Sequence, residues 1–235
     1  MKNFVFAGLL VTAAAVSANA QQWEFGGVGG GAFLNTVPVS GSSGSATAGF
    51  QKGGVFGGFV GQTFSTHIAG EIRYEYMQSN LSLSSGGSSA SFSGVSHAVH
   101  YDVLIHTNRH NSPVQVYAAV GGGVKIFDGT GTEAAYQPLS QYGYFTKTRS
   151  IKPMLDFGGG VRVMLHPHVF LRAEIRDFMT AFPTGVLTPP PGVKYRSLLN
   201  DIVPMAGLSF EFGNPASPQQ PGMTPNQPNQ TPNQQ

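Results

Sequence analysis

The chain has 235 residues, a length that suggests one domain with short appendages. Charged residues make up only 10% of it, against about 25% in ordinary soluble domains, so a charged surface is not what keeps this protein from aggregating. The formal net charge of +2 excludes the broad positive field that binds nucleic acid, and we expect no nucleic-acid partner.

Residues 1–20 have the features of an export signal. Lys2 supplies the positive start, Phe4 to Val16 form an apolar stretch, and Ala18-Asn19-Ala20 fits a cleavage site for small residues. Thirteen residues are too few to cross a bilayer as a helix, which argues against the alternative of a membrane anchor. We therefore predict cleavage before Gln21, which leaves a formal charge of (13 − 1) − 11 = +1, with no cysteine for disulfides.

From Trp23 onward, segments of alternating character recur between connections rich in Gly, Ser, Pro and Asn. Each segment is long enough for a tilted membrane strand, which needs about 9 to 11 residues. The eight predicted strands are 23–34, 50–62, 67–80, 93–107, 114–127, 151–165, 169–182 and 201–212.

The connections alternate in length. The short ones span 63–66, 108–113 and 166–168, whereas the long ones contain Ser/Gly-rich, Tyr-rich and Pro-rich stretches that suit mobile loops in water: 39–48, 81–91, 136–145 and 183–191. An even strand count with short turns at one rim and long loops at the other is typical of outer-membrane barrels, whose turns and chain ends face the periplasm.

Charged and apolar residues fall on opposite faces of these strands. Glu71, Arg73 and Glu75 alternate with apolar residues, and a period of two places the two sets on opposite sides. When the same alternation is followed along the other predicted strands, seven acids and five bases fall on the charged face. This near balance favours mutual pairing as a structural lumen charge network. The twelve predicted members are Glu24, Glu71, Arg73, Glu75, Asp102, Lys125, Asp156, Arg162, Arg172, Glu174, Arg176 and Glu211.

Alternation alone also fits a soluble lipocalin-like barrel, which would bury the apolar face and expose the charges. The scarcity of charge, the asymmetric connections and the aromatics near strand ends favour the membrane alternative. The aromatics that we expect to form interfacial girdles are Trp23, Phe25, Phe33, Tyr76, Phe127, Phe182, Phe210 and Phe212. The predicted fold is an all-β, eight-stranded, antiparallel, up-and-down transmembrane β-barrel over residues 21–212.

Three glycine runs, Gly29 to Gly31, Gly121 to Gly123 and Gly158 to Gly160, lie within predicted strands. Without a strand-to-helix junction, they do not form a phosphate-binding loop. Their predicted role is to relieve crowding and permit strong curvature in a narrow barrel.

Two stretches resemble the OmpA-like outer-membrane β-barrel domain family: Pro113 to Tyr117 running into Gly121 to Val124, and Phe157 to Arg162 followed by Phe170 to Phe178. The resemblance covers about residues 21 to 212. In that family the alternating Leu208, Phe210 and Phe212 would be the signal that the barrel-assembly machinery binds. The chain departs from the family after Phe212, because residues 213–235 form a Pro/Gln/Asn-rich tail that we expect to be disordered, without a peptidoglycan-binding domain.

The histidines do not suggest a metal or catalytic site. His67, His110, His166 and His168 fall at the short-turn rim, and the close pair His166 and His168 lacks an identifiable third ligand. We therefore expect no metal and no cofactor.

His97 and His100 lie towards the long loops, where an enzyme would need them. The lipid A deacylase type keeps a His and a Ser two residues apart, whereas here position 99 is Val99 and Ser96 falls on the opposite face from His97. For His100 we favour a lumen histidine paired with Asp102, and we expect no catalytic residue.

Our first hypothesis for the function is a non-enzymatic structural or surface-interaction barrel in the outer membrane of a Gram-negative-type bacterium. Its expected partners are outer-membrane lipid, the barrel-assembly machinery and an extracellular ligand at the long loops. Tyr136, Tyr142, Tyr144 and Phe145 would form either a recognition surface or a loop packed over the barrel mouth. The alternatives are a narrow channel for small or apolar solutes and, last, a lipid-modifying enzyme.

Overall fold

The computed structural model describes residues 22–41, 44–107, 112–132, 137–195 and 198–213. The predicted signal peptide, all of the predicted tail after Gly213, His110 and Tyr136 lie outside these ranges. Among the described residues, none belongs to a helix of the length and apolarity that would take it through a bilayer.

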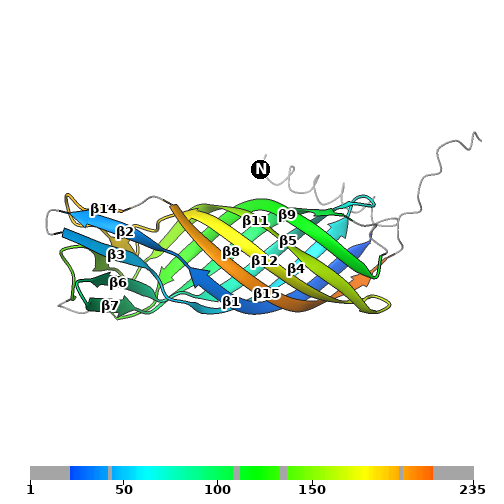
Figure 1. Cartoon of the computed structure of the whole chain (residues 1–235), viewed down its shortest axis with the longest axis horizontal. Coiled ribbons are helices and arrows are strands. Elements are labelled where there is room, and N and C mark those ends of the chain that lie inside the picture. Colours follow the sequence, from blue (N-terminus) through cyan, green and yellow to red (C-terminus); the bar gives the residue numbers. More distant parts are fainter. Residues whose placement is uncertain (1–21, 42–43, 108–111, 133–136, 196–197, 214–235) are drawn as a thin grey trace, which may run out of the picture.

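Eight antiparallel strands close into a barrel, and the predicted fold class is confirmed. Their order around the ring is β1-β15-β12-β11-β9-β8-β5-β4. In chain order they are β1 (Trp23–Leu34), β4 (Gly53–Thr63), β5 (Ile68–Gln78), β8 (Gly94–His106), β9 (Val114–Gly129), β11 (Arg149–His166), β12 (Val169–Ala181) and β15 (Leu198–Phe212). The strands are steeply tilted, as closure of a narrow barrel requires (Figure 1).

The first and last barrel strands close the ring. Trp23 of β1 faces Phe212 of β15, so the described chain enters and leaves the barrel at the same rim. The short turns β4–β5, β8–β9 and β11–β12 lie at this rim, which we call the turn rim, and the long connections lie at the opposite end, which we call the loop rim. The alternation of short and long connections therefore follows the prediction.

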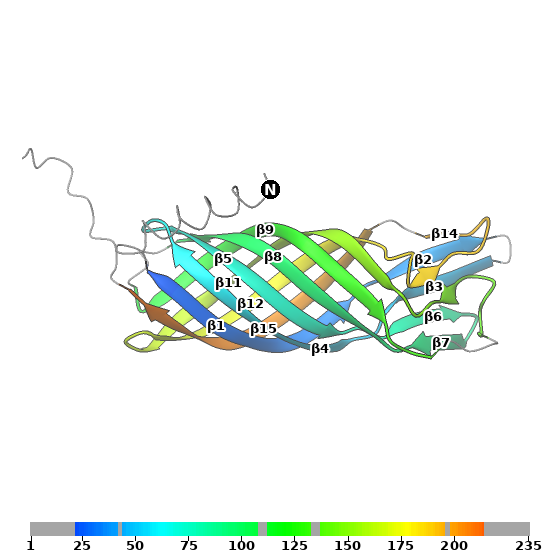
Figure 2. The same ribbon diagram turned by 180° about the vertical axis from the view of Figure 1, so that it is seen from behind.

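The long connections build a second sheet that continues beyond the loop rim, as Figure 2 shows from behind. This sheet, called the loop sheet below, has the order β14-β2-β3-β6-β7. Its strands are β2 (Thr36–Gly41), β3 (Gly44–Phe50), β6 (Leu81–Ser85), β7 (Ser88–Phe92) and β14 (Lys194–Tyr195), and a separate pair is formed by β10 (Tyr144–Phe145) and β13 (Leu187–Thr188).

The prediction of mobile loops at 39–48 and 81–91 is therefore wrong. Apolar residues such as Val39 and Leu83 alternate there with Ser and other small or polar residues, which is a strand pattern. Gly86 and Gly87 both have positive φ, 55° and 83°, as the two central residues of a type I′ hairpin turn require. The composition of segments 39–48 and 81–91 resembles that of a loop because Gly and Ser are abundant both in turns and in this hydroxyl-rich sheet.

The barrel is apolar outside and charged inside. Phe56, Ile72 and Ile175 face outward with exposed fractions of 62%, 60% and 57%, whereas Arg73 and Glu75 are buried. The soluble lipocalin-like alternative requires the reverse and is wrong. The girdle prediction is also wrong for Phe127 and Phe182, which are buried because both rings join the apolar cluster that the barrel shares with the long connections.

Two inward-facing glycines leave space for the charged side chains of the barrel interior. A Cβ at Gly121 would overlap the Asp102 carboxylate, and one at Gly158 would lie 2.6 Å from Cδ of Arg176. These positions therefore need glycine because a side chain would displace the buried ionic groups opposite.

Candidate functional site

The barrel interior is the candidate site. All twelve residues of the predicted network lie on the inner face, where period two places them, and eleven are buried, while Glu24 is partly exposed. Because a buried charge is costly unless it is paired, the partners of these groups determine what the interior can do.

The middle of the barrel is bridged by Arg73. Its guanidinium lies 2.7 Å from Glu71, 2.9 Å from Glu75 and 2.5 Å from Glu174. Arg73 belongs to β5 and Glu174 to β12, which lie four places apart in a ring of eight strands, so this ion pair spans the barrel. The Tyr117 hydroxyl donates a further hydrogen bond of 2.7 Å to Glu174. Opposite walls are thus tied together through the lumen.

Two arginines fill the half nearest the turn rim. Arg172 lies 3.0 Å from Glu71, and Arg162 lies 3.1 Å from Glu211. Both guanidinium groups stack on aromatic rings, Arg162 at 3.5 Å from the Phe170 centroid and Arg172 at 4.2 Å from that of Phe59. Arginine suits these places because its planar group combines ion pairing with stacking.

His100 lies nearer the loop rim, between two carboxylates. Its Nδ1 is 2.8 Å from Asp102 and its Nε2 is 2.8 Å from Glu75, so the structure has the expected pair with Asp102. Ligand atoms of His100, Asp102 and Asp156 lie within 4.8 Å of one another, close enough to share a metal ion. However, the Arg176 guanidinium is 3.0 Å from Asp102 and 2.7 Å from Asp156. It supplies the positive charge that a metal would bring, and we assign the group to the ion-pair network.

One buried acid, Asp201, is absent from the twelve predicted residues. Asp201 accepts a hydrogen bond of 2.6 Å from the Lys125 ammonium group, and both side chains are fully buried. The alternation of the last strand does indicate it, because Asp201 has the same parity as Glu211. However, Asp201 is the first residue of the predicted strand 201–212, where strand bounds are least certain to include a residue. The Phe127 and Phe178 rings flank the Lys125 ammonium group at 5.3 and 5.8 Å.

Between the Lys125–Asp201 pair and the loop rim, the interior becomes apolar. The side chains of Met77, Phe127, Phe178 and Leu199 are buried there and belong to one continuous cluster with the inner face of the loop sheet. Its members from the long connections include Val37, Val39, Phe50, Leu81, Leu83, Phe92, Phe145 and Leu187. An ionic layer and an apolar layer therefore follow one another along the barrel axis.

The Tyr-rich connection covers the loop rim. Tyr142 and Phe145 are buried, whereas Tyr144 is 48% exposed. The Tyr195 hydroxyl donates a 2.8 Å hydrogen bond to the Tyr142 carbonyl, and burial raises the pKa of Tyr195 to about 12. Of the two expectations, the described part of this connection fits a loop packed over the mouth, with Tyr144 left facing solvent.

His97 faces outward, apart from the interior. Its Nδ1 is 2.8 Å from the Tyr74 hydroxyl and its Nε2 is 3.9 Å from Asp128, which binds Arg149 at 2.7 Å. Ser96 points inward and hydrogen-bonds Ser79 at 3.0 Å. The structure thus places Ser96 and His97 on opposite faces, as parity requires.

Leu208, Phe210 and Phe212 also face outward, with exposed fractions of 54%, 42% and 45%. They stand on β15 beside β1, where the Phe25 ring lies 5.5 Å from that of Phe210. Their part in barrel assembly stays a prediction.

Comparison with known proteins supports this architecture. Residues 5–202 match the family model described as "Outer membrane protein beta-barrel domain". Among solved structures, OprG from Pseudomonas aeruginosa is 13% identical with a TM-score of 0.55, covering 83% of this chain and 97% of its own. Neisserial surface protein A is 14% identical with a TM-score of 0.50, covering 81% and 97%. No curated protein matches the chain in sequence. At these identities the structures support the fold alone.

Proposed function

The chain belongs to the family of outer membrane protein β-barrel domains, and from this premise we propose that it is a non-enzymatic, non-conducting barrel that presents the loop sheet outside the cell. In this proposal the ionic layer locks the wall and the apolar layer seals the loop rim. The exported chain loses residues 1–20, and Leu208, Phe210 and Phe212 direct its assembly.

One observation carries the proposal: both layers of the interior are filled by paired or packed side chains. Arg73 and Glu174 join opposite walls, and above them the buried rings of Phe127 and Phe178 continue into the core of the loop sheet. Eight strands enclose a space that side chains can fill, and opening a water path here would break several buried ion pairs at a cost of several kcal/mol each.

Planar-bilayer recording with the purified full chain tests this proposal. We expect no discrete conductance steps at neutral pH, under conditions in which a general porin inserted into the same bilayer conducts. Regular steps of one size would contradict the proposal and support the competing function, a narrow channel.

The lipid-modifying enzyme is the second alternative and would use His97 or His100. His100 is fully buried between carboxylates, and His97 contacts Tyr74 and Asp128, with no serine on the outer faces of β5, β8 and β9. Neither arrangement offers an activated nucleophile beside the lipid. We expect the lipid A of cells that overproduce the protein to have an unchanged mass spectrum, and a new acylation state that disappears in His97→Ala would sink this part of the proposal.

A further inference from the structure

Serine and threonine hydroxyl groups cover the outer face of the loop sheet. The register sets Thr47 beside Ser84, and Ser84 beside Ser89, so that hydroxyls of successive strands stand in rows. No Asp, Glu, Lys, Arg or His occurs in residues 44–50 or 81–92. The face formed by β3, β6 and β7 is therefore polar but uncharged.

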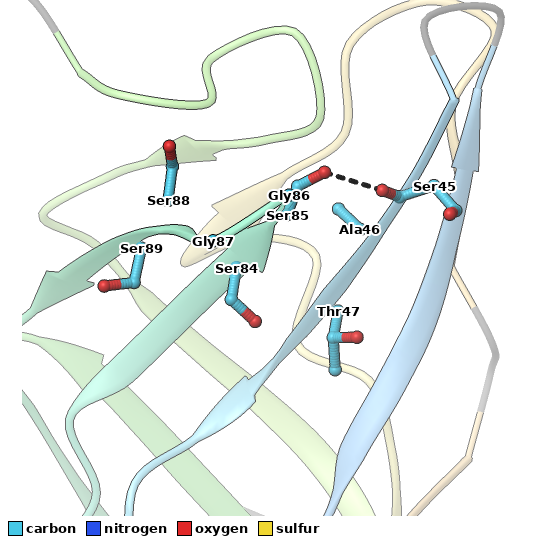
Figure 3. A pocket seen from close by; sticks show the side chains of 9 residues that line it. All are labelled: Ser45, Ala46, Thr47, Ser84, Ser85, Gly86, Gly87, Ser88 and Ser89. Carbon is cyan, nitrogen blue, oxygen red and sulfur yellow. Dashed lines mark hydrogen bonds between the residues drawn. The ribbon is translucent and has the colours of Figure 1, made fainter.

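A hollow of about 420 Å³ opens at the edge of this surface, where β3 and β6 stop pairing. The period of two gives Thr47, Ser84 and Ser89 to the outer face and Ala46, Ser85 and Ser88 to the other face of the sheet. Thr47 and Ser84 form the last pair, and beyond them the strands diverge around the tip of the β6–β7 hairpin. Six hydroxyl side chains surround the hollow in Figure 3, together with Ala46 and two turn glycines; they are Ser45, Thr47, Ser84, Ser85, Ser88 and Ser89.

Most of these hydroxyls are available to a ligand. Ser85 Oγ donates a 2.7 Å hydrogen bond to the Ser45 carbonyl, which ties the hairpin to β3 (Figure 3). The other five side chains, among them those of Thr47, Ser84 and Ser88, have no hydrogen-bond partner within the described part of the chain. A Cβ at Gly86 or Gly87 would meet nothing within 4 Å, so the turn leaves the hollow open on that side.

The chemistry of the lining selects the ligand. A hydroxyl both donates and accepts hydrogen bonds, which matches the hydroxyls of a sugar ring. The lack of charge gives no attraction for phosphate or sulfate groups, and Ala46 is the only apolar side chain at the wall, which leaves little for a lipid tail or an aromatic ligand. The volume lies within the range of about 300–1,000 Å³ that small-molecule sites occupy.

We propose that this hollow binds one or two rings of a neutral oligosaccharide. The inference rests on the proposed function, which places the loop sheet outside the cell. Neutral glycans reach that surface from two sources, as the sugar chains of glycolipids in the protein's own membrane and as glycans of other cells or in solution.

Titration of the full chain tests the site. The protein is held in an amine-oxide detergent, which carries no sugar to compete, and amide shifts are followed by NMR during addition of neutral hexose oligosaccharides. We expect saturable shifts in residues 44–47 and 84–89 with an affinity on the order of 1 mM, and weaker binding of the same oligosaccharides once sulfated. Tighter binding of the sulfated forms, or no shifts there at about 50 mM of any neutral probe, would overturn the proposal.

A matched pair of variants localises the binding. The triple variant Ser84→Ala, Ser88→Ala and Ser89→Ala removes three hydroxyls of the hollow and should weaken binding about tenfold. The control, Ser82→Ala with Ser91→Ala, removes hydroxyls of the same strands outside the hollow and should stay within about twofold. Equal effects of the two variants would overturn the assignment to the hollow.

Two further measurements separate the possible failures. Because the chain has no cysteine, Ser91→Cys introduces its one thiol, and labelling of intact cells by a membrane-impermeant maleimide reports which side the sheet faces. Labelling without sugar binding contradicts only the inference, whereas a thiol that is labelled only after cell lysis contradicts the proposed function. Titration in bilayer discs with and without glycolipid distinguishes the sources, because a glycolipid ligand occupies the hollow in advance and abolishes the shifts.

Discussion

The barrel wall and the loop sheet are built from neighbouring segments of the chain, yet the wall is apolar outside and polar inside, whereas the loop sheet is the reverse. In the wall, Ile72 and Phe56 face outward and Arg73 is buried. In the loop sheet, Val39 and Leu83 are buried and Ser84 is exposed. Both regions use the period of two, so the difference lies only in which set of residues faces the surroundings.

This opposite placement of apolar and polar side chains reflects the solvent around each region. In lipid an apolar side chain gains nothing by turning inward, so the inner face is free to hold charges, provided that each finds partners. In water the hydrophobic effect drives apolar side chains together, and the loop sheet folds over an ordinary core. On the first hairpin the two arrangements meet between Leu34 and Thr36, and our proposal places the outer edge of the membrane there.

The largest expected effect comes from removing Glu174, which contacts three arginines. Glu174→Gln keeps the shape but leaves Arg73, Arg172 and Arg176 short of one negative charge inside the barrel. We expect the free energy of unfolding to fall by about 3–5 kcal/mol, measured by urea titration in lipid vesicles. The control Glu24→Gln changes a partly exposed acid of the same network and should cost less than half of that value. Equal losses would mean that the ionic layer does not depend on the central pairs.

A lysine on the outer face distinguishes the two solvents directly. Ile72→Lys places a charge on the lipid-facing wall, where we expect a loss of about 2–4 kcal/mol in the same vesicles. Ser91→Lys introduces a lysine on the outer face of the loop sheet. There the free energy of unfolding should fall by no more than about 0.5 kcal/mol, because water solvates the charge. A large loss at Ser91 would show that this face is covered by lipid or by another part of the assembly.

Sequence alone predicted the wall well because alternation is local. Parity identified inner residues on seven of the eight barrel strands, all but the uncharged β4, and the lengths of the connections gave the topology without knowledge of any contact. The pairing of Arg73 with Glu174 was beyond reach, because these residues are about a hundred positions apart and meet only once the ring has closed.

The loop sheet was missed for a different reason. Its strands are short and rich in Gly and Ser, residues that also signal turns, and what stabilises them is burial of Leu83 and Phe92 against a core that spans distant connections. Phe127 and Phe182 were misplaced for the same reason, since an aromatic near a strand end forms a girdle only if the strand stops at the membrane.

The smallest net effect is expected at the junction of the two layers, where Lys125 meets Asp201. Lys125→Met alone leaves the fully buried Asp201 without its cation and should cost about 3 kcal/mol or more. The double variant Lys125→Met with Asp201→Leu removes both charges and should unfold within about 1 kcal/mol of the parent, because Phe127 and Phe178 already provide apolar surroundings. A double-mutant cycle in vesicles measures the coupling. If the double variant is as unstable as the single one, this pair holds the wall together as the central network does, and the border between the layers lies closer to the loop rim.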